Sequence, residues 1–181
     1  YNDSRSYASV TSNLTGEDYV GLLVGEASGN WNPASHPRPA NGPEKSISVE
    51  LPQMAAPTDK EIVIPVSVQG AADKEIISYE FSLRYDPSVI QPQADTVDVK
   101  GTASRGLSVV VNAEQAGLLR VVVYGPIAIE ENGVLLNLRF TAVGVPGWVS
   151  PLTWERIMFN EGEPQVVAAD GLISLSAAAS D

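Results

Sequence analysis

The 181-residue chain contains no cysteine and a single histidine. Without cysteine the fold cannot be held by disulfide bonds, so its stability must come from a packed core. The histidine, His36, lies among prolines, whereas a catalytic triad needs a base held rigidly beside its nucleophile. Two carboxylate pairs, Glu130–Glu131 and Glu161/Glu163, fall in expected loops and are interpreted as solvated charges. We therefore expect a protein that is not an enzyme.

Positive charge and long apolar runs are also scarce. Eleven lysines and arginines stand against 22 aspartates and glutamates, which gives a net charge of -11. Such a surface repels phosphates and anionic lipid, and no apolar run approaches the ~20 residues that cross a bilayer. We expect neither a nucleic acid partner nor membrane insertion. No signal peptide is recognisable, and because the chain starts at Tyr1 rather than methionine, we expect a processed product or a piece of a longer protein.

The chain does have many short runs of valine, isoleucine and leucine, separated by 15 glycines and 13 prolines. Short apolar runs separated by glycine and proline are typical of all-β domains, in which turns connect short strands. The clearest run is Ile76–Tyr85, in which Tyr79, Phe81, Leu83 and Tyr85 alternate with polar residues. Strict alternation predicts a strand with one face on the core and the other in water. The proline of the following Asp86-Pro87 is expected to end the strand.

The same reasoning predicts a two-sheet, jelly-roll-like β-sandwich of about nine strands over residues 46–177, with a short tail at 178–181. Pro65 lies within a predicted strand, which must therefore be an edge strand or carry a bulge. The nine predicted strands are Ile47–Leu51, Glu61–Val68, Ile76–Tyr85, Thr96–Lys100, Leu107–Asn112, Leu118–Tyr124, Gly133–Ala142, Leu152–Phe159 and Gly171–Ser176.

Residues 46–176 resemble cohesin domains, the β-sandwich modules that bind dockerins in bacterial extracellular assemblies. The resemblance rests on the order of several segments: Ile47–Leu51, Ile64-Pro65-Val66 followed by Gly70, the Tyr85-Asp86-Pro87 corner, Gly133–Phe140, Ser150–Thr153, Phe159–Gly162 and Ala169–Leu175.

The resemblance implies a non-catalytic scaffolding module at the cell surface or outside the cell, in an assembly that handles polysaccharide. In cohesins an Asn and an Asp on the third strand are central to dockerin binding, and by position they fall on Ser78 and Glu80. The changed identities depart from the family pattern, although both residues are expected to point outward. Four further outward residues are expected to share or flank this protein-binding face: Arg84, Arg120, Val122 and Tyr124. The alternative is that these four, with Ser78 and Glu80, are simply the solvent-exposed side of a half-buried sheet.

The first 45 residues differ in composition from the rest. Residues 1–33, with Ser28-Gly29-Asn30-Trp31, resemble the closing segment of dockerin-like domains, and residues 34–45 are predicted to be a proline-rich linker. Glu26–Asn30 keeps one carboxylate of a calcium loop, and we favour a structural turn over a calcium site there, with no other metal or cofactor expected. Asn2 and Asn13 each begin an N-glycosylation tripeptide.

Two further functions stay open at the level of the sequence. The apolar strand candidate Tyr19–Val24 could pair with a sheet edge of a neighbouring copy and so build a filament; its packing residues are Tyr19, Val20, Leu22 and Leu23, with Trp31. Alternatively, Trp148 and Trp154 could form a platform for sugar rings if both lie exposed on one plane.

Overall fold

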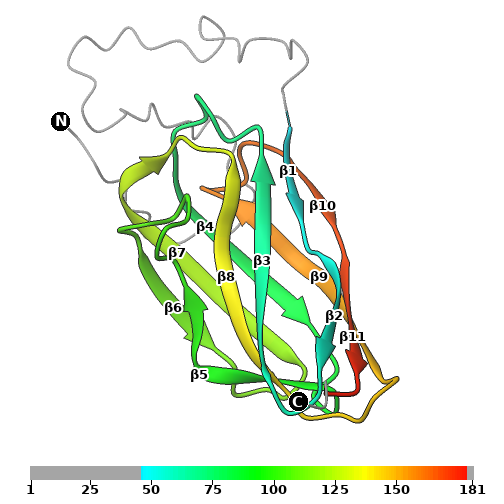
Figure 1. Ribbon diagram of the computed structural model, residues 1–181. Coiled ribbons are helices and arrows are strands. Elements are labelled where there is room, and N and C mark those ends of the chain that lie inside the picture. The colour runs from blue at the N-terminus through cyan, green and yellow to red at the C-terminus, as the bar shows by residue number, and fades with distance from the viewer. Residues whose placement is uncertain (1–45, 179–181) are drawn as a thin grey trace, which may run out of the picture. The chain divides into compact units, whose positions relative to one another are not determined.

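The computed structural model describes residues 46–178. It contains eleven strands and no helix in that range, arranged as a five-stranded sheet in the order β10-β1-β3-β8-β5 and a six-stranded sheet in the order β2-β11-β9-β4-β7-β6. Figure 1 shows the two sheets as layers, with β3 and β8 in front of β4, β7 and β9. The strands are β1 (Ile47–Glu50), β2 (Gln53–Pro57), β3 (Glu61–Gln69), β4 (Ile76–Arg84), β5 (Ile90–Asp98), β6 (Ser108–Asn112), β7 (Leu118–Ile129), β8 (Gly133–Ala142), β9 (Val149–Phe159), β10 (Val166–Ala169) and β11 (Gly171–Ser176).

The all-β sandwich predicted from the sequence is confirmed, with two strands more than expected. Both missed strands, β2 and β10, are short and arise where the chain changes sheets. β1 pairs in parallel with β10 in one sheet, and directly afterwards β2 pairs in parallel with β11 in the other. A side chain at Gly171 would place its Cβ 2.6 Å from the Pro52 carbonyl oxygen. Glycine is therefore needed where the β1–β2 and β10–β11 segments pass side by side from one sheet to the other.

Pro65 lies in the half of β3 that pairs only with β8, because β1 pairs with β3 no further than Ser67. The register between β3 and β8 also shifts between Val66 and Ser67. At Pro65 the strand is therefore a local edge and lies next to a bulge. Either condition alone allows a proline within a strand.

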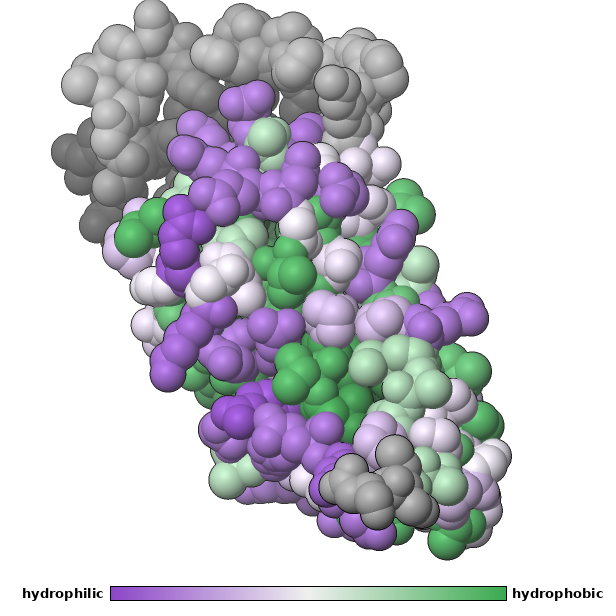
Figure 2. Space-filling model, in the orientation of Figure 1, coloured by the Kyte–Doolittle hydropathy of each residue, from purple (hydrophilic) through white to green (hydrophobic). Residues whose placement is uncertain are grey.

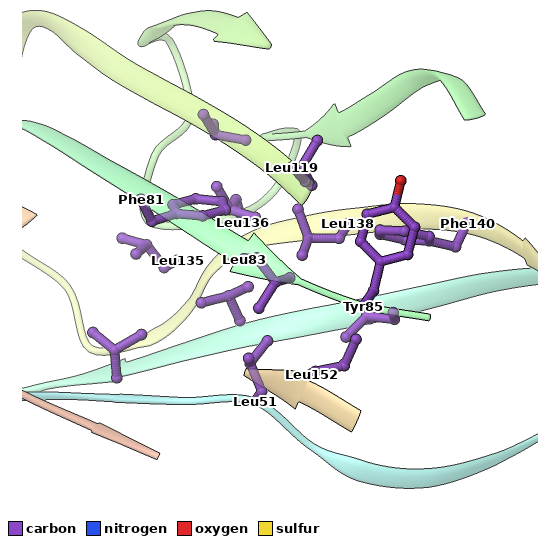
Figure 3. Packing of buried hydrophobic residues seen from close by; sticks show 14 of the residues in the cluster. Leu51, Phe81, Leu83, Tyr85, Leu119, Leu135, Leu136, Leu138, Phe140 and Leu152 are labelled. Atoms are coloured by element: carbon purple, nitrogen blue, oxygen red, sulfur yellow. The ribbon is translucent and has the colours of Figure 1, made fainter. Parts of the chain in front are cut away.

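The core fills the space between the sheets with the inward side chains of both. On β4 the residues Tyr79, Phe81 and Leu83 are buried, as is Tyr85 after the strand, and their polar neighbours face outward as predicted. Tyr85 meets Phe140 of β8 edge-on, with ring centroids 5.2 Å apart, among leucines from both sheets (Figure 3). Alternation is broken once on β8, where the bulge opposite Val66 and Ser67 allows both Leu135 and Leu136 to be buried.

The Tyr85-Asp86-Pro87 corner ends β4 through a compact set of hydrogen bonds. The Asp86 carbonyl accepts from the Val89 and Ile90 amides, each at 3.0 Å. The Asp86 carboxylate accepts from the Ser88 hydroxyl at 2.6 Å and amide at 2.9 Å, and these bonds hold the pKa of Asp86 below its usual range. The corner thus turns the chain from one sheet into β5 of the other.

One polar pair is enclosed in this core. The Tyr79 hydroxyl lies 2.7 Å from the Ser104 hydroxyl, and both side chains are almost completely buried. Burial raises the pKa of the Tyr79 phenol well above its usual range, and the hydrogen bond to Ser104 offsets only part of this effect. Because the raised pKa keeps the proton on the folded protein, its contribution to stability is complete below about pH 10 and is lost as the pH rises through the raised value.

We expect Tyr79→Phe to lower the free energy of unfolding at pH 7 by about 1–3 kcal/mol, because the buried Ser104 hydroxyl loses its partner. The same variant should lose less stability than the wild type between pH 10 and higher pH, since the titrating phenol is gone. Urea unfolding at pH 7 and at a pH above 10 measures both effects. Tyr124→Phe, at a residue 49% exposed, is the matched control and should change neither. A Tyr79→Phe protein as stable as the wild type would contradict the role of this pair.

Candidate protein-binding face

The candidate site is the outward side of strands β6, β7, β4 and β9, which we call the outer face. β4 lies at its centre, hydrogen-bonded to β7 on one side and to β9 on the other. Because Tyr79, Phe81 and Leu83 face the core, the alternating residues Ser78 and Glu80 must face away from it. Figure 1 shows these four strands side by side in one layer.

Strand register brings the predicted site residues together in rows. Ser78 of β4 lies opposite Tyr124 of β7, and Glu80 lies opposite Val122. Arg120 lies opposite Ser82 in the next row. Directly opposite residues have Cβ atoms roughly 4.5–5.5 Å apart, so five of the six predicted residues form one continuous patch. The sixth, Arg84, lies at the end of β4 beside β9 and flanks the patch.

The middle of the patch is apolar and exposed. Val122 is 40% exposed and Tyr124 49%, and β6 adds Val110, 55% exposed, directly opposite Val122. A partner that covered these side chains would remove apolar area from water without any rearrangement of the sheet. The opposite face of the domain, seen in Figure 2, carries hydrophobic residues interspersed with hydrophilic ones.

A bulge in β9 shapes the charged border of the face. Leu83 pairs with Trp154 whereas Ser82 pairs with Arg156, which leaves Glu155 as the extra residue. Glu155 and Arg156 are consequently both exposed. Glu155 accepts a hydrogen bond from Arg84 at 2.6 Å, and Arg156 forms an ion pair with Glu80 at 3.1 Å. Exposed pairs of this kind add little stability to the fold.

Several members of the face were not predicted from the sequence. Arg156 was missed because alternation from Leu152 places it inside the core. The signal was present, since an arginine on the inward phase of a strand is itself an indication of a bulge. Ser82 and Val110 were recognisable as strand residues, but their place beside Arg120 and Val122 depends on the order of strands in the sheet. That order is not readable from a single sequence.

Trp148 and Trp154 do not form the platform for sugar rings that the carbohydrate-binding hypothesis requires. Trp154 is half-buried, meets Phe81 edge-on at 5.3 Å, and donates its indole N–H to the Ala169 carbonyl at 3.0 Å. Trp148 is 48% exposed at the β8–β9 connection. Only one of the two rings is therefore presented to solvent, and the carbohydrate-binding alternative loses the feature on which it depended.

The remaining candidate groups have ordinary surface roles. Arg105 donates two hydrogen bonds to Glu131, at 2.9 and 3.0 Å, and so holds the pKa of that carboxyl below its usual range. Glu161 and Glu163 lie in the exposed turn after β9.

Residues 46–178 contain no cluster of metal-ligating side chains, and none of their elements is a helix capable of crossing a membrane. The predictions on Asn2, Asn13, Tyr19, Val20, Leu22, Leu23, Glu26, Trp31 and His36 lie outside the described residues.

We expect the outer face to tolerate substitution without loss of the fold. Val122→Arg and Val63→Arg, at exposed positions on the two sheets, should each change the free energy of unfolding by less than about 0.5 kcal/mol. Phe81→Ala, on the inward side of β4 opposite Val121 and only 2% exposed, should cost about 3–5 kcal/mol because it leaves a cavity. Urea unfolding compares the three variants. A large loss for Val122→Arg would show that this side chain is structural.

The comparisons with known proteins bear on the family and the fold of the domain. A sequence model of the family described as Cohesin domain matches residues 47–172. No curated protein sequence matches the chain.

Solved cohesin structures have the same fold. A non-cellulosomal cohesin from the archaeon Archaeoglobus fulgidus superimposes with a TM-score of 0.59 at 18% identity, covering 73% of this chain and 92% of its own. The seventh ScaB type I cohesin from Pseudobacteroides cellulosolvens gives 0.59 at 20% identity, covering 75% and 95%. The Coh-OlpA–Doc918 complex, a type I cohesin–dockerin complex from Clostridium thermocellum, gives 0.57 at 21% identity, covering 72% and 99%. The resemblance first seen in the Tyr85-Asp86-Pro87 corner and its neighbouring segments is thus confirmed, and the chain belongs to the cohesin domain family.

Proposed function

We propose that this domain is a non-catalytic module that attaches a dockerin-like protein to an extracellular or cell-surface assembly through its outer face. The observation that carries the proposal is the exposed apolar patch of Val110, Val122 and Tyr124, bordered by charged residues. An apolar centre with a polar rim is the usual anatomy of a protein–protein interface. Tyrosine and arginine, both present here, are also the residue types that most often dominate binding energy.

The outer face offers a surface rather than a reaction site. One shallow hollow on this face is lined by Glu80, Phe81, Ser82, Arg120, Val121, Val122 and Arg156. The Glu80 and Arg156 side chains are 38% and 60% exposed, and Arg120 is exposed as well, so the hollow encloses no charged group. The function that fits is recognition of another protein.

The partner must differ from an ordinary dockerin in its contacts with β4. Cohesins carry Asn and Asp at the positions of Ser78 and Glu80, which implies a changed hydrogen-bond pattern at the centre of the interface. Glu80 retains a carboxylate, but Arg156 already holds it at 3.1 Å. An assembly that handles polysaccharide, with residues 1–33 as the end of a dockerin-like unit and 34–45 as a linker, is the setting that we propose.

Self-association is the second candidate. β6 pairs with β7 only and has no second neighbour in the described part of the chain, and its Val110 and Val111 are exposed. An apolar edge strand of this kind can pair with a strand of another copy. Light scattering on the full chain distinguishes this reading, since a concentration-dependent increase in mass would favour a polymer over a module that awaits a foreign partner.

We expect the 181-residue chain to bind at least one member of a panel of dockerin modules that includes those of the solved Clostridium thermocellum and Acetivibrio cellulolyticus complexes. Val122→Arg should weaken that binding at least about 30-fold, because it places a charge in the apolar centre of the interface. Val63→Arg, the same change on the other sheet, should leave the affinity unchanged. Biolayer interferometry measures the dissociation constants. Binding that Val122→Arg leaves intact would place the interface elsewhere.

A further inference from the structure

The charge of the outer face differs in sign from that of the chain. The whole chain carries a net charge of -11, yet the outward positions of β6, β7, β4 and β9 hold three arginines, Arg84, Arg120 and Arg156, against two glutamates, Glu80 and Glu155. Each glutamate is already paired with an arginine, Glu155 with Arg84 and Glu80 with Arg156. One positive charge, that of Arg120, is left over.

Arg120 has no carboxylate partner among residues 46–178. Its guanidinium donates one long hydrogen bond, at 3.4 Å, to the amide oxygen of Gln115. Glu114 lies in the adjacent turn and forms no ion pair with it. Most of the five N–H donors of this side chain are therefore unused within the described domain.

The unused donors border the shallow hollow of the outer face. Ser82 lies between the two arginines, opposite Arg120 on β7 and opposite Arg156 on β9. The hollow is lined by these three side chains together with Glu80 and Val122. The Ser82 hydroxyl makes no hydrogen bond to another residue of the described domain, so it too is a free donor. We call this arrangement the Ser82 notch.

We propose that the Ser82 notch receives a single carboxylate side chain of the protein partner. Arg120 would hold that carboxylate through paired N–H donors, with the Ser82 hydroxyl as an additional donor. The proposal rests on the proposed function, because the same partner must cover Val122 at the edge of the notch.

The charges around the notch favour a monovalent group. Glu80 borders the hollow, and only one arginine there lacks a counter-charge. A phosphate, with up to two negative charges, would meet the repulsion of Glu80 and of a strongly acidic chain. A carboxylate matches the single unpaired guanidinium in charge and in shape. The partner that fits therefore has an apolar centre with an Asp or Glu beside it.

The test uses the full 181-residue chain as bait for a yeast-displayed library of dockerin modules randomised at solvent-exposed positions. Clones that bind the wild type and fail to bind Val122→Arg are sequenced. We expect Asp and Glu to be enriched several-fold over the unselected library at one or more positions. Selection on Arg120→Glu should lose that enrichment and favour Lys or Arg. Lys100→Glu, an equal change of charge in the turn after β5 and away from the outer face, should reproduce the wild-type result.

Selected clones then give the size of the effect. Arg120→Glu should weaken binding of an acidic clone about 10-fold or more, and exchange of the acidic residue of the clone for Arg should restore it. Ser82→Ala should weaken binding by roughly 3- to 10-fold, as expected for one hydrogen bond.

The outcomes separate the two proposals. Val122-dependent binders with no acidic enrichment, or an Arg120→Glu bait that selects the same residues as the wild type, would overturn the notch and leave the proposed function standing. A library without Val122-dependent binders would overturn both.

Discussion

Burial of alternate side chains between two sheets is the constraint on which the rest of this domain depends. Once Tyr79, Phe81 and Leu83 are buried between the sheets, the residues between them must face outward. A slip of one residue in register would expose the core and bury Glu80, which the protein could not tolerate. The outward direction of Ser78, Glu80 and Ser82 is thus fixed by the buried residues that alternate with them.

The same constraint explains why much of the fold was readable from the sequence. Period-2 alternation in Ile76–Tyr85 identified β4, its inward residues and its end at Asp86-Pro87, and the family resemblance singled out its outward residues Ser78 and Glu80 as binding candidates. Elements that break the period were harder to find. β2 and β10 are four or five residues long and arise from a change of sheet, and β5 begins at Ile90, six residues before the predicted start, because its pairing with β8 is interrupted between Pro92 and Val97.

The outer face was predictable in part for the same reason. Residues of β4 and β7 were named correctly as outward because each strand alternates, and register then brings them together. Arg156 and the Ser82 notch depend on a bulge in β9 and on which strands are neighbours, both of which are tertiary facts. The face therefore combines a pattern written locally in two strands with a charge arrangement that exists only after the sheet has assembled.

The joint crossing of the first and last strands has a mechanical consequence. β1 runs parallel to β10 in one sheet, and β2 runs parallel to β11 in the other. The first two strands, which begin at Ile47, are thus hydrogen-bonded to the last two, which end at Ser176. Tension applied through the two flanks would pull these strands along their own axes in opposite directions. All hydrogen-bonded pairs of both short ladders would then resist together in shear rather than opening one at a time.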